Sequence, residues 1–166
     1  HLVKSDFSEL ATAGFTRVAV PTSHGGFWES LPTATRPICQ ALRTLAKGDS
    51  SVALVSAMHP AVLSYWLAAR ETTPEDQHWS AQAEGVFQSA SEGHWWGTMT
   101  SEPGSGGDVL QSKTRAQRVS DPASYQLTGS KHFGSGSGIM TYMVTAALAD
   151  NEVEPDWFFI DMRNRA

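Results

Sequence analysis

The first half of the chain places apolar residues at the three- and four-residue intervals of amphipathic helices. This spacing predicts a helix over 37–48, with Lys47 in its last turn and Gly48 as its end. The apolar positions of that helix are Ile38, Ala41, Leu42 and Leu45. A shorter helical segment at the start of the chain is expected to end at Gly14.

A second helix is predicted to run to about Arg70, with mostly apolar faces. Pro60 lies inside this stretch, where it removes a backbone hydrogen bond, so a kink or an interruption is expected there. The candidate residues for capping its N-terminus are Asp49, Ser50 and Ser51.

A third helix is predicted to open at Thr73 and Pro74 and to end at Gly85. Proline suits the first turn of a helix, and glycine commonly follows the last turn. The chain up to about residue 93 is therefore expected to be helical.

After Gly93 the pattern changes to short β-favouring runs separated by glycine, proline, aspartate and asparagine. The predicted strands are 95–100, 113–120, 125–128, 142–149 and 156–162. The second of these alternates polar and small residues, which favours a half-exposed strand. The fold class is therefore α+β, with the boundary between 91 and 94.

Composition and charge narrow the class of protein. The chain is 40% hydrophobic with a formal net charge of −5, which supports a folded core and argues against nucleic-acid binding. Cys39 is the only cysteine, so a reducing, cytoplasmic location is expected. The apolar run 52–69 is broken by polar residues and favours a buried helix over a membrane span. Because the chain begins at His1, we expect it to be part of a longer protein.

Two glycine-rich segments carry most of the chemical information. The first, 98–108, reads Thr-Met-Thr-Ser-Glu-Pro-Gly-Ser-Gly-Gly-Asp, and the second, 127–138, contains Lys-His-Phe-Gly-Ser-Gly. Glycines let the backbone approach a flat or phosphorylated ligand closely, and hydroxyl and aromatic groups can bind the edge and the face of a ring. Together these groups have the character of a flavin site.

The two segments resemble the middle domain of the acyl-CoA dehydrogenase family, with its pattern Thr-Glu-Pro-Gly-x-Gly-Ser-Asp followed by Gly-x-Lys-x-Trp-Ile-Thr-Asn. The resemblance covers nearly the whole chain. It implies an N-terminal α-helical domain over 1–93 and a flavin-binding middle domain over 94–166, incomplete and shaped like an antiparallel β-barrel. No part of the chain matches the family's C-terminal helical bundle.

The resemblance implies FAD as cofactor and assigns roles residue by residue. Thr100 and Ser101 match positions at the flavin edge, and Phe133 matches the tryptophan that packs on the ring. The remaining cofactor-binding positions are Ser135, Gly106 and Gly107. Gly107 replaces a serine of the family, which removes a side-chain donor, and glycines replace two residues of the second turn.

The implied reaction is α,β-dehydrogenation of an acyl-CoA thioester in fatty acid metabolism. The expected partners are an electron-transferring flavoprotein and further copies of the chain, as a tetramer or dimer. The family's catalytic base lies in the missing C-terminal domain, so no catalytic residue is assigned and this piece is expected to be inactive alone. One alternative is a two-component monooxygenase of the same fold, which takes reduced FMN or FAD from a flavin reductase. Another is a non-catalytic interaction module.

Other polar residues have structural interpretations. Glu102 and Asp108 are predicted to be turn or capping groups, and His59 a hydrogen-bonded core histidine. The histidines lack the spacing of a zinc site, so no metal is expected. Trp95 and Trp96 are adjacent on a strand and should point in opposite directions, one into the core and one toward an interface.

Overall fold

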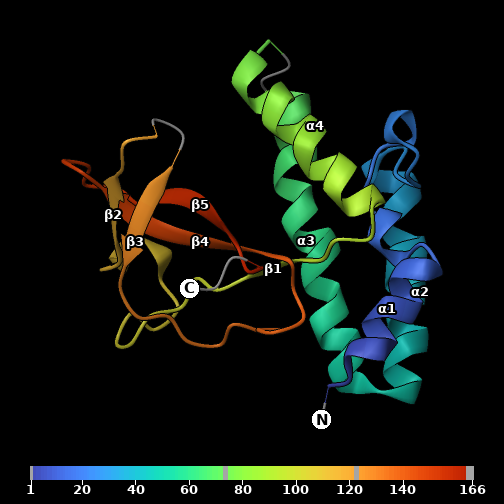
Figure 1. The fold of residues 1–166 in the computed structure, drawn as a ribbon. Coiled ribbons are helices and arrows are strands. Elements are labelled where there is room, and N and C mark those ends of the chain that lie inside the picture. Colours follow the sequence, from blue (N-terminus) through green and yellow to red (C-terminus); the bar gives the residue numbers. More distant parts are fainter. Residues whose placement is uncertain (1, 73–74, 122–123, 164–166) are drawn as a thin grey trace.

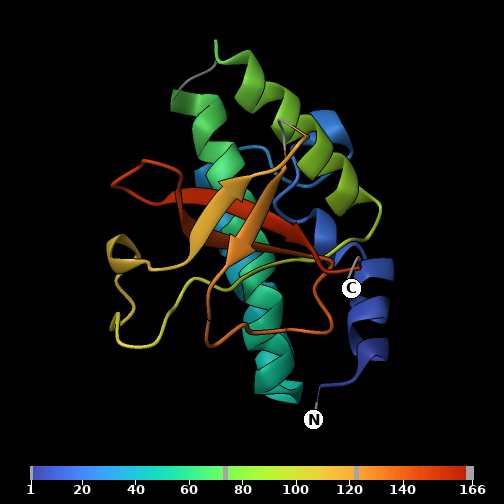
Figure 2. The same cartoon turned by 60° about the vertical axis from the view of Figure 1, so that its left-hand side comes forward.

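A computed structural model describes residues 2–72, 75–121 and 124–163. Helices make up the first half and a sheet the second, and the sheet lies to one side of α3 (Figures 1 and 2). The described α-helices are α1 (Lys4–Thr12), α2 (Leu31–Gly48), α3 (Ser50–Thr72) and α4 (Gln77–Ser91). This order confirms the α+β prediction.

Two helix boundaries differ from the predicted ones. α2 begins at Leu31, six residues before Pro37, because Pro32 suits a first turn and Pro37 removes only one interior hydrogen bond. α4 continues through Gly85 to Ser91. A β-carbon at Gly85 would meet nothing within 4 Å, so this glycine marks an exposed helical position and not a stop.

Aspartates cap two of the helices. Asp49 accepts hydrogen bonds from the backbone N–H groups of Ser51 and Val52 at 2.7 and 3.1 Å, which confirms the predicted start of α3. Asp76 caps α4, whereas Thr73 and Pro74, the predicted opening of that helix, lie outside the described residues. α3 runs through Pro60 as one continuous helix, so the predicted interruption is wrong.

The sheet contains strands in both directions. The described strands are β1 (Trp96–Thr98), β2 (Arg115–Arg118), β3 (Tyr125–Thr128), β4 (Tyr142–Ala149) and β5 (Asp156–Asp161). β4 lies at the centre, parallel to β1 and β2 and antiparallel to β5, while β2 and β3 form an antiparallel pair. The sheet is therefore mixed and not wholly antiparallel, because long connections from β1 and β2 return β4 in the same direction.

Strand burial follows position in the sheet. β4 has a run of buried residues from Met143 to Ala147, as a central strand covered on both faces should. In β2 only Ala116 is buried, which confirms the prediction of a half-exposed strand. The first 3-10 turns, η1 (Phe15–Arg17) and η2 (Thr22–His24), connect α1 to α2.

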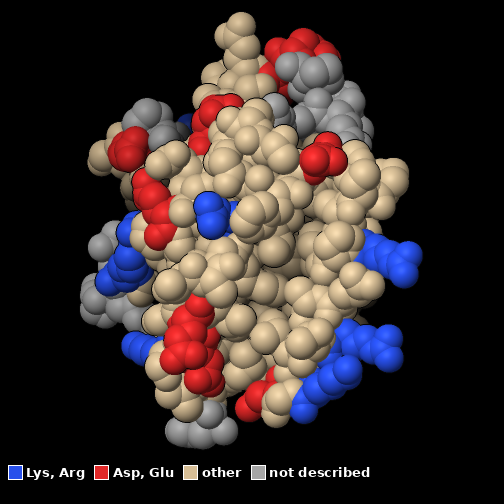
Figure 3. Space-filling model, turned by 90° about the vertical axis from the view of Figure 1, so that its right-hand side faces the viewer, with Lys and Arg blue, Asp and Glu red and all other residues tan. Residues whose placement is uncertain are grey.

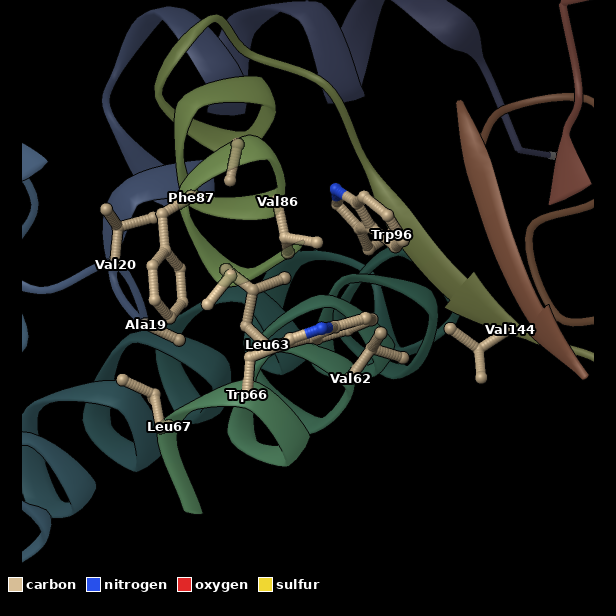
Figure 4. Packing of buried hydrophobic residues seen from close by; sticks show 12 residues of the cluster. Ala19, Val20, Val62, Leu63, Trp66, Leu67, Val86, Phe87, Trp96 and Val144 are labelled. Carbon is tan, nitrogen blue, oxygen red and sulfur yellow. The ribbon is translucent and has the colours of Figure 1, made fainter. Parts of the chain in front are cut away.

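Most of the buried apolar residues that the structure describes form two clusters, and the two adjacent tryptophans, Trp95 and Trp96, belong to one cluster each. Trp96 packs edge-on against Trp66 at 5.3 Å between ring centroids, among side chains of α3 and α4 (Figure 4). Trp95 stacks on Phe15 at 5.8 Å and meets Phe7 edge-on. Their opposite directions are confirmed, but the predicted interface role is wrong, since α1 and η1 cover Trp95 as well.

Two further features concern the outside of the molecule. The stretch Ser50–Ala69 of α3 is long and apolar enough to cross a membrane by length and composition alone, but 56% of its most apolar window is buried in the fold. That burial favours a core helix. The face over the helices is largely uncharged, and most of its Lys and Arg side chains lie toward the two sides of the view and not in one central patch (Figure 3). The division into domains 1–93 and 94–166 stays a prediction, with α4 ending at Ser91 and β1 beginning at Trp96.

Candidate functional site

The two glycine-rich segments lie side by side. Both run along the lower edge of the sheet, the first leaving β1 and the second leading into β4 (Figures 1 and 2). The His132 N–H donates to the Ser101 carbonyl oxygen at 2.8 Å, which joins them directly. The Thr145 hydroxyl of β4 donates to the Met99 carbonyl oxygen at 2.7 Å and holds the start of the first segment on the sheet. Sequence positions about thirty residues apart therefore form one loop pair, residues 99–112 and 129–141.

A buried ion pair joins the same two segments. Lys131 Nζ lies 2.5 Å from Glu102 Oε1, and the two side chains are only 10% and 4% exposed. Glu102 Oε1 also accepts from the Ser112 hydroxyl at 2.6 Å and from the Thr114 N–H at 3.1 Å, while its Oε2 accepts from the Lys113 N–H at 2.6 Å. Lys131 Nζ donates to the Ala146 carbonyl oxygen of β4 at 2.6 Å. The pair therefore ties both loops to the sheet.

The surroundings of Glu102 keep it ionised. Burial alone would raise the pKa of this carboxyl, but Lys131, the Ser112 hydroxyl and the backbone N–H donors hold its pKa well below the usual range. The predicted turn role is confirmed for Glu102, whose carbonyl oxygen accepts from the Ser105 N–H at 3.3 Å, but the prediction did not include the ion pair that its carboxylate makes with Lys131. The predicted capping role is confirmed for Asp108, which accepts from the Leu110 N–H at 3.0 Å at the start of η3 (Val109–Gln111).

Sequence reasoning missed the Glu102–Lys131 pair, although the signal was present. Both residues occupy fixed positions of the two motifs, the acid after Ser101 and the lysine two residues before Phe133. An acid and a base in two loops expected to converge on one ligand have a strong reason to pair. Reading each motif by itself hid that connection.

The hydroxyl residues of the candidate site are half-buried. These are Thr100, Ser101 and Ser135. Within the described part of the chain, none of these hydroxyls makes a hydrogen bond to protein, so each is available to a ligand. A half-buried hydroxyl with no protein partner gains most from a bound polar ligand.

Gly106 and Gly107 form an exposed turn of the first loop. Their φ angles are +62° and +88°, values that favour glycine, and a β-carbon at either would meet nothing within 4 Å. The Ser105 hydroxyl accepts from the Gly107 N–H at 3.3 Å and steadies the turn. Among the described residues, no hydrogen bond joins these glycines to the second loop.

Phe133 has a backbone conformation that is rare for a large side chain. Its φ is +53°, and the residue is 84% exposed. The Ser135 N–H donates to the Phe133 carbonyl oxygen at 2.7 Å, which closes a tight turn around Gly134. The exposed ring contributes no burial energy to folding, and the positive φ costs stability; backbone strain of this kind is concentrated at ligand sites.

His59 forms a second buried polar centre, between α3, η1 and β1. Its Nδ1 accepts from the Trp96 N–H at 3.0 Å, so the proton is on Nε2, which donates to the Thr16 carbonyl oxygen at 2.8 Å. Complete burial lowers the pKa of His59 to about 4, so the ring is neutral at pH 7. The prediction of a hydrogen-bonded core histidine is confirmed, and both ring nitrogens are occupied.

Comparison with known proteins identifies the fold of the chain. No family model and no curated protein matches the sequence. The TdsC structure from Paenibacillus sp. A11-2 with FMN and indole matches with a TM-score of 0.72 at 21% identity, over 96% of this chain and 37% of that chain. Butyryl-CoA dehydrogenase from Megasphaera elsdenii matches with a TM-score of 0.72 at 22% identity, over 93% and 39%. The chain has the acyl-CoA dehydrogenase fold.

A third structure of this fold, KijD3 in complex with FMN and a dTDP-linked sugar, gives a TM-score of 0.72 at 20% identity, over 93% of this chain and 36% of that chain. The chain thus spans less than half the length of these structures. It corresponds to the helical and β parts of the acyl-CoA dehydrogenase fold, as the sequence motifs predicted. The predicted contacts of Thr100, Ser101, Gly106, Gly107, Phe133 and Ser135 with a cofactor stay predictions.

Proposed function

We propose that the loop pair binds a flavin and that the chain is the flavin-binding part of an oxidoreductase. The observation that carries this proposal is the exposed ring of Phe133 on a strained turn, beside half-buried hydroxyls without protein partners. Flavins need these groups: donors for the polar edge of the ring system and an apolar surface for its face. Structures of the same fold with bound FMN support the choice of ligand.

Each residue of the loop pair has its own role in the proposed flavin binding. The Thr100 and Ser101 hydroxyls donate to the flavin edge, the Phe133 ring packs against the face, and the Ser135 hydroxyl supplies a further donor. Gly106 and Gly107 leave open space for the phosphate end. The bound flavin would supply hydride acceptance, and the protein would orient the ring and exclude water from it.

For the whole protein, the reaction that we infer is α,β-dehydrogenation of an acyl-CoA thioester with FAD. Similarity to butyryl-CoA dehydrogenase supports it. We assign no base among the described residues: Glu102 is committed to Lys131, and His59 is buried with both nitrogens bonded. The isolated piece should therefore show no turnover. A cytoplasmic homo-oligomer that passes electrons to an electron-transferring flavoprotein completes the proposal.

A second candidate is a monooxygenase that takes reduced FMN or FAD from a flavin reductase. Phe133 in place of the family's tryptophan favours it, because the smaller ring offers less surface for holding oxidised flavin tightly. Similarity to TdsC, solved with FMN and indole, supports this alternative. The two candidates differ in which redox state of the flavin binds more tightly.

The first test is the visible absorption spectrum of the desalted protein, followed by titration with FAD, FMN and their reduced forms. Tight oxidised FAD supports the dehydrogenase, and preference for reduced flavin supports the monooxygenase. Phe133→Ala should weaken binding about tenfold and Ser101→Ala about fivefold. Val153→Ala, at a 90% exposed position away from both loops, is the matched control. Failure of a folded protein to bind any flavin would leave the interaction module.

A further inference from the structure

A second site lies away from the loop pair, where α3 and α4 meet the sheet. A cavity of about 420 Å³ opens there, with walls from both helices and from β4 and β5. None of its lining residues belongs to loops 99–112 or 129–141. Its volume is in the lower part of the range of small-molecule sites, roughly 300–1,000 Å³.

The cavity is lined by aromatic side chains that are partly exposed to solvent. Tyr65 of α3 is 46% exposed, Trp79 of α4 41%, and Trp157 and Phe159 of β5 50% and 46%. Tyr65 and Trp157 face each other across elements with ring centroids 5.5 Å apart. Large aromatic side chains from three elements thus present ring surface to one cavity, which is the arrangement that binds flat apolar molecules.

The polar groups of the lining also limit which ligands can bind in the cavity. Among the described residues of the lining there is no lysine, arginine, histidine, aspartate or glutamate, so a charged ligand would find no counter-charge from them. The lining does contain the amide of Gln82. Its Oε1 accepts from Trp66 Nε1 at 2.7 Å, and Trp66 is fixed in the core (Figure 4). Its NH2 group therefore remains, without a hydrogen-bond partner among the described residues, as a donor for a ligand.

We propose that this cavity binds a flat, uncharged aromatic molecule of one or two rings that carries a hydrogen-bond acceptor. The rings of Tyr65, Trp79 and Trp157 contact its faces and edges, and the Gln82 amide donates to its acceptor. The site is separate from the proposed flavin site and does not depend on it. A protein segment is a poorer fit, since among the described lining residues its backbone N–H groups would find only the Tyr65 hydroxyl and the already occupied Gln82 oxygen as side-chain acceptors.

The test is calorimetric titration with quinoline at pH 8, where quinoline is uncharged. Naphthalene has the same shape without the acceptor, and 1-decalone, an uncharged bicyclic ketone, has an acceptor without the flat aromatic ring. Quinoline should bind, naphthalene about tenfold more weakly, and 1-decalone not measurably. Equal binding of all three compounds would overturn the proposal.

Variants place the binding in the cavity. Trp157→Ala and Tyr65→Ala should weaken quinoline binding at least about tenfold, and both positions are exposed enough for the protein to stay folded. Gln82→Glu keeps an oxygen for Trp66 but replaces the NH2 donor with a charged oxygen, so it should remove the preference for quinoline over naphthalene.

A reciprocal control separates this site from the flavin loops. Phe133→Ala should leave quinoline binding unchanged, and Trp157→Ala should leave flavin binding unchanged. Quinoline binding that is lost with Phe133→Ala and kept with Trp157→Ala would contradict the proposal. Sedimentation is the other check: self-association abolished by Trp157→Ala would show that a second copy of the chain fills the cavity, which also overturns it.

Discussion

Two regions each contain one buried titratable side chain: the loop pair contains Glu102, and the helix–strand junction, where α3, η1 and β1 meet, contains His59. One of these side chains is charged and the other is neutral. Glu102 is ionised and lies against Lys131 with four donors around it. His59 is neutral and makes two hydrogen bonds, to Thr16 and Trp96. Both connect segments that are far apart in the chain.

The difference follows from what each site offers. A buried carboxylate is tolerated only where a counter-charge and several donors replace water, and the loops supply them because their backbone is irregular and its N–H groups are free. The helix–strand junction has few free backbone groups. A neutral imidazole, which donates at one nitrogen and accepts at the other, matches a single carbonyl and a single N–H. Loops and packed elements thus select different chemistry.

The largest expected effect is loss of the counter-charge. Lys131→Met leaves the buried Glu102 carboxylate without its counter-charge, and we expect it to lower the free energy of unfolding by about 3–5 kcal/mol at pH 7. Urea denaturation measures this change. The double variant Glu102→Gln with Lys131→Met leaves no unpaired buried charge and keeps one side-chain oxygen that can accept from Ser112 and from the Thr114 N–H, so it should lose less than the single variant. Equal losses would mean that Lys131 acts through packing, and the contrast with His59 would fail.

The next largest effect is the loss of stability on acidification that follows from the neutral state of His59. The pKa of His59 falls from 6.5 in the unfolded chain to about 4 in the folded one, so below pH 6.5 the unfolded state binds a proton that the folded state does not. Stability attributable to His59 is therefore complete above pH 6.5 and is lost as the pH falls toward 4. Between pH 6.5 and 4.5 the loss should be about 2–3 kcal/mol.

The matched variant for acidification is His59→Gln, which keeps a donor and an acceptor but cannot take up a proton. Its stability should change less between pH 6.5 and 4.5 than that of the wild type, measured by urea denaturation at each pH. Below pH 4.5 both proteins should lose further stability, because the depressed pKa of Glu102 makes the unfolded state bind the next proton. Parallel profiles down to pH 4.5 would show that His59 is not responsible.

The sequence predicts regular elements better than it predicts their contacts. The runs 125–128 and 142–149 coincide with β3 and β4, because β-favouring residues there end at clear turn signals. Gly85 misleads because a glycine on an exposed helix face costs only about 1 kcal/mol, which neighbouring helical residues can offset. The low helix propensity of a single glycine is thus overridden where the residues on both sides of it favour a helix.

The candidate site shows the same limit. Glycines and hydroxyls at Gly106, Ser101 and Ser135 could be recognised as ligand-facing because their types report backbone freedom and donor capacity. The burial of Glu102 could not, since a short polar loop gives no sign of what covers it. The strain at Phe133 is also invisible, because a positive φ at a large residue contradicts local preference. Tertiary contacts decide both.

The smallest expected effects sharpen the comparison where the second loop packs on α3. Gly136 has a φ of +82°, and a β-carbon there would lie 2.8 Å from Val55 Cγ1 and from Met140 Cε. Gly136→Ala should therefore lower the free energy of unfolding by about 1–3 kcal/mol, from backbone strain and overpacking together.

Gly106→Ala is its control, since the φ of Gly106 is +62° but a β-carbon there would meet nothing within 4 Å. Strain alone should lower the free energy of unfolding by about 1 kcal/mol, and thermal unfolding of the two variants compares them directly. A larger loss for Gly136→Ala would mean that the second loop packs tightly against α3. The loop pair with Glu102 and the junction with His59 would then unfold together as one cooperative unit. Equal losses would mean that the loop can move away from α3, and that the ion pair stabilises the loops independently of the junction held by His59.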